Sequence, residues 1–377
     1  MMAFALTGAR VFDGERINDG LAVVIEGACI VDVVANENLS MGIKRHNLDG
    51  GLLVPGFIDV QVNGGGGALL NDNPTIDTVR RIAESHRKFG TTGLLPTVIT
   101  DAPDVLSKAI AAVKAARAEN VPGILGIHIE GPFLDKERRG AHALRFIREM
   151  TEADVTQITA IDCGSVMLTL APNRVAPTLI KSLAANGVFV SLGHSEASLA
   201  EVTNALASGA RAFTHIFNAM SQMNGRDPGM VGAALADPHS FCGLIADGYH
   251  VHDAAMRVAL AAKPKDRMML ITDAMPTAAG GPDSFELQGR AVQRVNGKLL
   301  LADGTLAGSN LTMDVALRYC VERLGAALED ALQMASLNPA AFLGRDHELG
   351  RIKPGYLASL VHLDDDLRVL ETWIDGR

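Results

Sequence analysis

The stretch PGFIDVQVNG (Pro55–Gly64) begins with an apolar run, ends in two amides and is followed at once by further glycines. Successive side chains on a strand point to opposite faces, so Gln61 and Asn63 face the same side. Glycine after a strand lets the backbone approach a ligand closely. Histidines at these two positions would chelate a metal, whereas amides are far weaker ligands for zinc or iron. The stretch therefore indicates a strand that leads into a ligand site.

The same pattern repeats from here onward: a short apolar run, a polar or glycine-rich break, and an alanine-rich helical stretch. This is the βα signature of a parallel sheet. Eight such units in roughly 290 residues predict an α/β fold, a closed (β/α)8 TIM barrel, whose strands are near-continuous apolar runs because both faces are buried. The expected strands are GFIDVQV, TGLLPTVI, GILGIHIE, VMLTLAP, VFVSLGH, AFTHIFN, FCGLIAD and MMLITDA.

The two ends of the chain have a different character. Alternating strands with Gly/Asp turns predict a small β-sandwich domain formed jointly by residues 1–53 and 350–377. The barrel is then expected over residues 54–349, with a hairpin insertion near 285–304 that turns at Asn296-Gly297. Helices are expected at 74–89, 103–119, 175–186, 196–208, 252–262, 311–324 and 331–343.

The composition argues against several classes of partner. The chain has 377 residues, 48% of them hydrophobic and 4% aromatic, and a net charge of -9. An acidic chain without a Lys/Arg block is not suited to nucleic-acid binding. Four scattered cysteines predict neither a disulfide framework nor a cysteine zinc site. Because signal-peptide features are lacking and no apolar run reaches the roughly 18 residues of a membrane span, no membrane contact and a cytoplasmic location are expected.

Metal-competent residues follow several of the predicted strands, at the barrel end where catalytic groups gather. Glu130, His194 and His215 end separate strands and form a three-ligand set for a catalytic divalent metal. Asp273 ends the last strand and is then free to act as a base. His128 could compete with Glu130 as a ligand, although it lies deeper in its strand. The other polar residues at strand ends are Gln61, Asn63, Asp247 and His250.

Each of these residues also has a structural interpretation. A single histidine after an apolar strand is more often a hydrogen-bonded core or loop residue than a ligand. Glu130 could form a buried ion pair, and Asp273 could cap a turn. Packing alone rarely places four metal-competent or basic groups at the ends of four separate strands, so the pattern favours a metal site.

Hydrolysis is the chemistry that fits this set. A metal polarises a carbonyl and lowers the pKa of bound water, and an aspartate takes the water's proton and returns it to the leaving group. A histidine can hold the developing oxyanion. His142, in the loop RRGAHAL, is a candidate for that role, although a solvated loop histidine is an equally good interpretation.

A second group of residues suggests an anionic substrate. After His215 the loop IFNAMSQMNGRDPG carries Asn218, the backbone amide of Ala219 and Arg226. Amides and an arginine can bind a phosphate or a carboxylate. Arg226 considered alone is better explained as a surface arginine paired with Asp227.

Together these motifs resemble the N-acetylglucosamine-6-phosphate deacetylase family of the amidohydrolase superfamily. The resemblance covers nearly the whole chain and is carried by PGFIDVQVNG, GIHIEGPF, GAH, LGHS, THIFNAM, GRDPG, IADGYHV, LITDAM and GTLAGSNLTM. It implies hydrolysis of N-acetyl-D-glucosamine 6-phosphate to D-glucosamine 6-phosphate and acetate, with metal-bound water as the nucleophile.

The resemblance also implies a role for each site residue. Glu130, His194 and His215 match metal ligands, Asp273 matches the general acid/base, and His142 matches the residue that polarises the acetyl carbonyl. In the family, the arginine that matches Arg226 reaches the neighbouring subunit's site, so a homodimer is implied. The residues that match substrate contacts are Ala141, His142, Asn218, Ala219, Arg226, His250, Ala307, Gly308 and Ser309.

Gln61 and Asn63 depart from the His-x-His with which many amidohydrolases hold a second metal. This departure resembles the family's single-metal branch, so one divalent ion per subunit is expected. Zinc is favoured, and Fe²⁺ or another divalent ion fits the same ligands. Gln61 and Asn63 are then expected to orient water, ligands or substrate.

Two other functions compete with this interpretation. An enzyme of the same architecture could act on a cyclic ureide or a different N-acetyl amino sugar, but a neutral ring has no use for the Arg226 loop. A barrel that has lost catalysis could serve as a binding or assembly protein, but such a scaffold has no need for Asp273 beside a complete ligand set.

Overall fold

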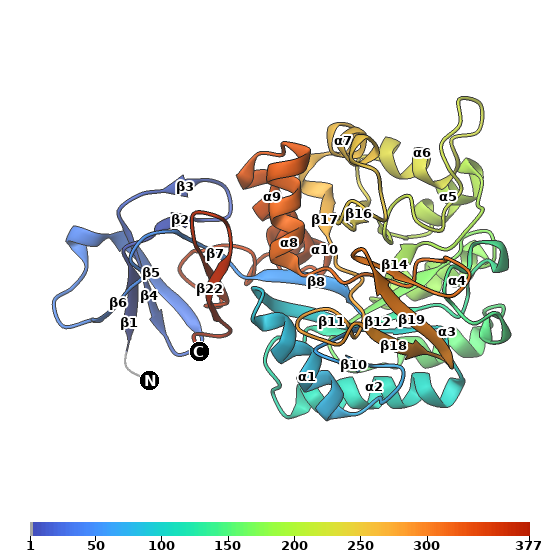
Figure 1. The fold of residues 1–377 in the computed structure, drawn as a ribbon, viewed down its shortest axis with the longest axis horizontal. Helices are drawn as coiled ribbons and strands as arrows, with labels where there is room; N and C mark the ends of the chain where they lie inside the picture. The colour runs from blue at the N-terminus through green and yellow to red at the C-terminus, as the bar shows by residue number, and fades with distance from the viewer. Residues whose placement is uncertain (1–2) are drawn as a thin grey trace.

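The computed structural model describes residues 3–377, in which a barrel of eight parallel strands stands beside a smaller β part (Figure 1). All eight expected strands are present, which confirms the TIM barrel. In barrel order they are β8 (Phe57–Val62), β11 (Thr91–Ile99), β12 (Gly126–Glu130), β13 (Ser165–Leu170), β14 (Phe189–Leu192), β15 (Ala212–Phe213), β16 (Phe241–Leu244) and β17 (Met268–Leu270).

The barrel closes where the first strand meets the segment after the last. Val62 pairs in parallel with Ala274. The Asn63 N–H donates to the Ala274 carbonyl at 3.0 Å, and the Asp273 N–H donates to the Gln61 carbonyl at 3.0 Å. The closure thereby places the amides of the first strand next to the carboxylate that follows the last.

Helices cover the barrel where the alanine-rich stretches predict them. The expected ones are α1 (Ile76–Arg87), α2 (Pro103–Ala118), α4 (Pro177–Ala185), α5 (Leu199–Ala207), α7 (Asp253–Ala262) and α8 (Met313–Arg318), the last continuing as a π-helical turn (Tyr319–Leu324). Short 3-10 turns lie at Asn36–Asn38, Lys136–Arg138, Leu144–Phe146 and Lys265–Arg267. Within residues 3–377, none of the helices has the length and apolar character that crossing a membrane requires.

Three helical features differ from the sequence expectation. The prediction of one helix over 331–343 is wrong, because α9 (Leu328–Ala335) ends before α10 (Leu337–Phe342) begins. In an unbroken helix, the ring of Pro339 would clash with the carbonyl of Ala335, four residues earlier. The helix therefore breaks at Ser336. Two further helices escaped prediction, α3 (Glu152–Thr159) and α6 (Gly229–Ala236). Both have only eight residues, and α6 is also apolar all round, so it lacks the helical periodicity of an amphipathic segment.

The smaller part contains strands from both ends of the chain. A four-stranded sheet has the order β5-β4-β1-β6 and a five-stranded sheet has the order β22-β21-β7-β2-β3. In the second sheet Leu360 pairs with Pro55, so segments far apart in sequence are neighbours. The strands are β1 (Phe4–Thr7), β2 (Arg10–Phe12), β3 (Ile17–Asn18), β4 (Leu21–Glu26), β5 (Cys29–Ala35), β6 (Lys44–Asn47), β7 (Leu52–Pro55), β21 (Leu360–Leu363) and β22 (Val369–Trp373).

After β17 the chain forms an antiparallel sheet of β18 (Ser284–Leu287), β19 (Arg290–Val295) and β20 (Lys298–Leu300), which we call the inserted sheet. Its turns are Gln288-Gly289 and Asn296-Gly297, all with positive φ. Its apolar side packs on Ile99 and Met275, and Figure 1 shows β18 and β19 in front of β11 and β12. A small hairpin, β9 (Gly64–Gly65) and β10 (Ala68–Leu69), adds Leu69 to this cluster.

Asp59 is a fully buried carboxyl group inside the barrel, two residues before Gln61. It accepts hydrogen bonds from the Thr272 hydroxyl at 2.5 Å and from the Gln61 N–H at 3.1 Å. Burial raises the pKa of Asp59 to about 7, against the lowering effect of these bonds. The closure of the barrel therefore includes an acid that stays protonated under mildly acidic conditions.

We expect Asp59→Asn to change how stability depends on pH. The native protein keeps the Asp59 proton at pH values where the unfolded chain, with an aspartate pKa of about 3.9, has released it. Wild-type stability should therefore fall relative to the variant as pH rises from about 4 to about 7, by on the order of 1 kcal/mol per pH unit, and the difference should stay constant above that range. Urea unfolding of both proteins measures this, and a difference that does not vary with pH would mean that native Asp59 is ionised.

Candidate active site

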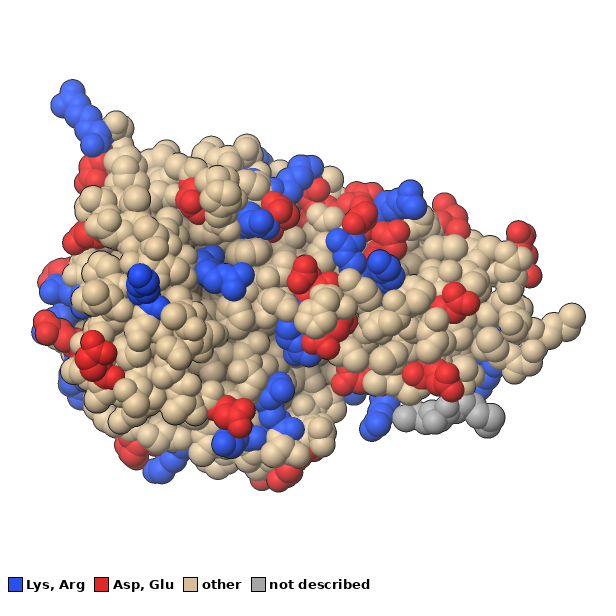
Figure 2. Space-filling model, turned by 180° about the vertical axis from the view of Figure 1, so that it is seen from behind, with Lys and Arg blue, Asp and Glu red and all other residues tan. Residues whose placement is uncertain are grey.

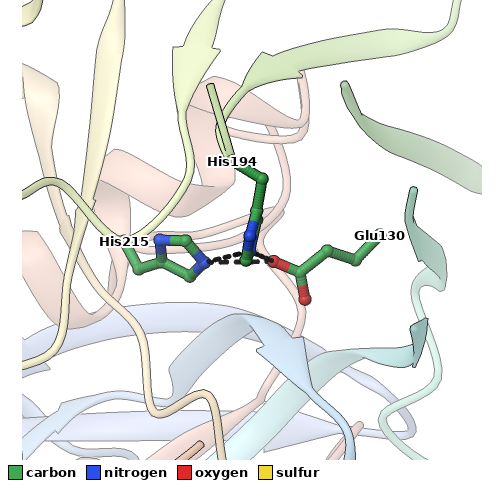
Figure 3. Close-up of side chains that lie close together, drawn as sticks. All are labelled: Glu130, His194 and His215. Atoms are coloured by element: carbon green, nitrogen blue, oxygen red, sulfur yellow. Dashed lines mark hydrogen bonds and ion pairs between the residues drawn. The ribbon is translucent and has the colours of Figure 1, made fainter. Parts of the chain in front are cut away.

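Glu130, His194 and His215 meet at or just beyond the C-terminal ends of β12, β14 and β15 (Figure 3). The Nε2 atoms of His194 and His215 lie 3.2 and 3.1 Å from Glu130 Oε1, and 3.0 Å from each other. All three residues are buried. Burial alone raises the pKa of Glu130, but hydrogen bonds to and charge on the two histidines hold this pKa well below its usual value.

This donor set fits a divalent metal ion. Nδ1 of His194 lies 2.8 Å from the Arg138 carbonyl oxygen, which can only accept, so Nδ1 carries a proton and Nε2 is the ring nitrogen left to bind a metal ion. Nε2 of His215 and an oxygen of Glu130 converge on the same point. Two histidines and one carboxylate are a ligand set that catalytic zinc sites with an open position use, so these three buried residues could hold such an ion.

The backbone is strained at the residues that form this site. His194, His215, Ala219 and Asp273 have φ values of 50°, 31°, 51° and 51°. Residues other than glycine rarely adopt this left-handed region, and such conformations cluster at functional sites. The strand ends are therefore shaped to present these side chains and amides.

Gln61 and Asn63 hold two carboxylates rather than facing away from the site. Asn63 Nδ2 donates to Asp273 Oδ1 at 2.7 Å. Gln61 Nε2 lies 3.2 Å from the same oxygen and 3.1 Å from Glu130 Oε2. Burial, together with the charge of Glu130, raises the pKa of Asp273 to about 6. The amides at the end of the first strand thus link Glu130 to Asp273.

His142 lies beside the three-residue cluster, whereas His128 does not belong to it. The ring of His142 is 4.5 Å from that of His194, and its Nδ1 is 2.8 Å from the Thr100 hydroxyl. Burial and the charge of His194 lower the pKa of His142 to about 3, so this ring is neutral. His128 has both ring nitrogens against threonine hydroxyls deeper in the barrel.

A cavity of about 190 Å³ opens above these groups. It brings together most of the sequence-predicted residues and adds apolar neighbours. Its lining consists of Ile99, Glu130, Gly140, Ala141, His142, His194, His215, Asn218, Ala219, Ile245, His250, Asp273, Met275, Thr305, Leu306 and Gly308.

Five predicted substrate contacts lie outside this lining: Gln61 and Asn63, which are buried against the two carboxylates, and Arg226, Ala307 and Ser309. Arg226 is exposed in the loop that precedes α6, which projects from the barrel in Figure 1. Ala307 and Ser309 are buried beside Gly308, and the Ser309 N–H donates to the Asp273 carbonyl at 2.9 Å. On the face seen in Figure 2, lysine and arginine side chains alternate with aspartate and glutamate.

Sequence reasoning missed two residues that support the site. Thr100 holds His142 and directly follows β11, a position that signals a functional role in a barrel. Asp59 lies two residues before Gln61 on the same face of β8, and this spacing could have identified it as a residue that supports the site. Thr100 offers neither a metal ligand nor a base, and Asp59 lies inside its strand rather than at the C-terminal end where catalytic groups are expected. Six cavity-lining residues were also missed, namely Ile99, Gly140, Ile245, Met275, Thr305 and Leu306.

Comparisons with known proteins agree with this geometry. Residues 52–377 match the amidohydrolase family, and residues 2–53 match the NagA composite domain. An N-acetylgalactosamine-6-phosphate deacetylase of Shewanella sp. (strain ANA-3) is 42% identical, over 98% of this chain and 94% of the relative. The human N-acetylglucosamine-6-phosphate deacetylase is 38% identical, over 88% and 84% of the two chains.

A solved structure gives the same result at the level of the fold. The crystal structure of N-acetylglucosamine-6-phosphate deacetylase from Pasteurella multocida superposes with a TM-score of 0.96 at 32% identity, covering 100% of this chain and 99% of that one. The family match spans most of the sequence, including every residue of the donor set. The chain belongs to the amidohydrolase family.

Proposed function

We propose that this protein hydrolyses the N-acetyl group of N-acetyl-D-glucosamine 6-phosphate, giving D-glucosamine 6-phosphate and acetate. The observation that carries the proposal is that Glu130, His194 and His215 converge on a cavity that also contains Asp273 and His142. Relatives that match most of the chain are named for the deacetylation of amino-sugar phosphates. The proposed location is the cytoplasm.

Glu130, His194 and His215 would hold one divalent ion, with zinc proposed and Fe²⁺ or another divalent ion as alternatives. Such an ion supplies a Lewis acid for the acetyl carbonyl and lowers the pKa of water. Asp273 takes the proton of the attacking water and returns it to the departing amine nitrogen. Because Gln61 and Asn63 both donate to Oδ1 of Asp273, Oδ2 is the oxygen left to exchange this proton.

His142 stabilises the charge that develops on the acetyl oxygen. Its Nδ1 is held by the Thr100 hydroxyl, which leaves Nε2 as the ring nitrogen for the substrate. A neutral imidazole can donate one hydrogen bond from that atom, and donors fixed before the reaction stabilise an oxyanion most effectively.

The cavity also offers groups suited to the sugar phosphate. Asn218, Ala219 and His250 line it, and Asp247 accepts from Nδ1 of His250 at 2.7 Å, which leaves Nε2 for the ligand. Within residues 3–377, the lining contains no lysine or arginine. We infer that Arg226 of a second subunit supplies the missing positive charge and that the active form is a homodimer.

A second candidate substrate is N-acetyl-D-galactosamine 6-phosphate, an epimer of the first. Two relatives named for that substrate, from Shewanella sp. and Escherichia coli O157:H7, are 42% and 39% identical, whereas the human relative named for the glucosamine compound is 38% identical. The metal site and the base serve both epimers equally.

Removing and restoring the metal tests the reaction and the number of ions. After chelation, we expect release of free amine from N-acetyl-D-glucosamine 6-phosphate to return as zinc is added and to plateau at about one metal per chain. Asp273→Asn is the matched control, which should bind zinc equally and lose about 10²- to 10⁴-fold in rate. A plateau at about two metals would overturn the single-ion proposal, and no amine release with any divalent ion would overturn the function.

Comparing the two epimers decides between the candidate substrates. We expect a higher kcat/KM for N-acetyl-D-glucosamine 6-phosphate, measured as amine release under identical metal loading. A preference of about tenfold or more for the galactosamine epimer would instead select the second candidate, since a site that hydrogen-bonds one hydroxyl discriminates strongly against its misplacement.

Heterodimers test whether Arg226 acts between subunits. An Arg226→Ala chain and an Asp273→Asn chain carrying different tags are co-expressed, and the mixed dimer is isolated through both tags. Each homodimeric variant should be nearly inactive, but the mixed dimer should recover about half of wild-type activity, because one of its two symmetric sites combines an intact Asp273 with an intact Arg226. If Arg226 acts within its own chain, the mixed dimer stays inactive.

A further inference from the structure

The turn between β18 and β19 reaches the two residues that hold His142. Gln288 Nε2 donates to the Thr100 carbonyl at 2.7 Å and to Asp101 Oδ2 at 2.9 Å. Arg290 Nη2 donates to the carbonyl of Ala141. Thr100 supplies the hydroxyl at Nδ1 of His142, and Ala141 immediately precedes His142. The inserted sheet therefore forms hydrogen bonds both to the His142 loop and to Thr100, the residue that contacts Nδ1 of His142.

Gln288 occupies a position that a glutamine adopts at a cost. Its φ is 53° and that of Gly289 is 80°, closely matching Asn296 and Gly297 at the other turn of the same sheet, at 50° and 83°. Asparagine and glycine are the residues preferred in such turns. Gln288 Oε1 is also buried without a hydrogen-bond partner among residues 3–377, which is unfavourable. These two unfavourable features at one residue indicate that the long side chain of Gln288 has a function.

Apolar packing holds the inserted sheet against the barrel, so that its hydrogen bonds can position the His142 loop. Leu287 and Val292 are fully buried in one cluster with Ile99 and Met275. Ile99 is the residue before Thr100, and Met275 lines the cavity. The apolar contacts of the sheet thus include the residue next to Thr100 and a residue of the cavity lining.

The Thr100 hydroxyl can select which ring nitrogen of His142 carries the proton, through the direction of its own hydrogen. Its single hydrogen can go to Nδ1 of His142, at 2.8 Å, or to the Glu130 carbonyl, at 3.3 Å. When it is donated along the shorter contact, Nδ1 is the acceptor and Nε2 carries the ring proton. Only that tautomer can donate a hydrogen bond from Nε2 into the cavity.

We propose that Thr100, Gln288 and Arg290 form a brace that positions His142. Thr100 sets the tautomer of the ring, while Gln288 and Arg290 fix the backbone on either side of the contact. The brace rests on the deacetylation proposed above, in which His142 acts on the acetyl oxygen. Its members are positioning residues, because they act through His142.

Gln288→Asn tests the brace without disturbing the turn. Asparagine suits the left-handed conformation but is one methylene too short to reach the Thr100 carbonyl. We expect an unchanged or higher Tm, unchanged zinc content, and a kcat reduced about tenfold with KM altered less than about twofold, as expected for a misplaced catalytic group. Gln293→Ala, an exposed residue of the same sheet, is the matched control and should leave kcat unchanged.

Variants of Thr100 add a readout that does not depend on turnover. Histidine-selective ¹⁵N NMR of the zinc-loaded wild type should show His142 protonated at Nε2, with the signal assigned from a His142→Gln sample. Thr100→Val should lose this preference and lower kcat about a hundredfold, and Thr100→Ser should restore both. A wild-type kcat in Gln288→Asn, or a His142 protonated at Nδ1 in the wild type, would overturn the brace. Absence of amine release from the wild type would instead overturn the deacetylase function, and the NMR result would still decide the brace.

Discussion

The pairing of the first barrel strand with the segment after the last is the constraint on which the site depends. The N–H of Asp273 donates to the Gln61 carbonyl, and the N–H of Asn63 donates to the Ala274 carbonyl, each at 3.0 Å. These bonds remove the open edges of the sheet, as closure of a barrel requires. They also fix the side chains of Gln61 and Asn63 against the carboxylate of Asp273. Fold and chemistry thus share the same few backbone contacts.

Two carboxyl groups of the site, those of Glu130 and Asp273, are compensated differently. Glu130 is matched by two histidine nitrogens, which fits a carboxylate that stays ionised and binds a cation. Asp273 receives only neutral amide donors, so its pKa stays raised, to about 6. Environments that separate the behaviour of two neighbouring carboxyl groups are how one site assigns a ligand and a base. The side-chain amide of Gln61 donates a hydrogen bond to each of these two carboxyl groups.

The sequence predicted the parts of this structure that local pattern controls. Eight apolar runs marked the strands, and the barrel rule then placed Glu130, His194, His215 and Asp273 together. The break at Ser336 could have been foreseen from Pro339, since a proline inside a helix has a known effect. The contact of Gln288 with Thr100 could not, because it joins residues far apart in sequence through a side-chain amide and a backbone carbonyl. No periodicity or motif encodes such a pair.

The sheet shared by the two ends of the chain imposes an order on folding. Strand β7 lies between β2 and β21, and its pairing with β21 joins residues near 55 to residues near 360. During synthesis on the ribosome, β7 therefore keeps one unpaired edge until the roughly 300 residues that follow it, up to β21, have emerged. Contacts of such sequence separation slow folding, and exposed strand edges invite pairing with other chains. The nascent barrel can form first, but this sheet of the β part is completed only after β21 has emerged.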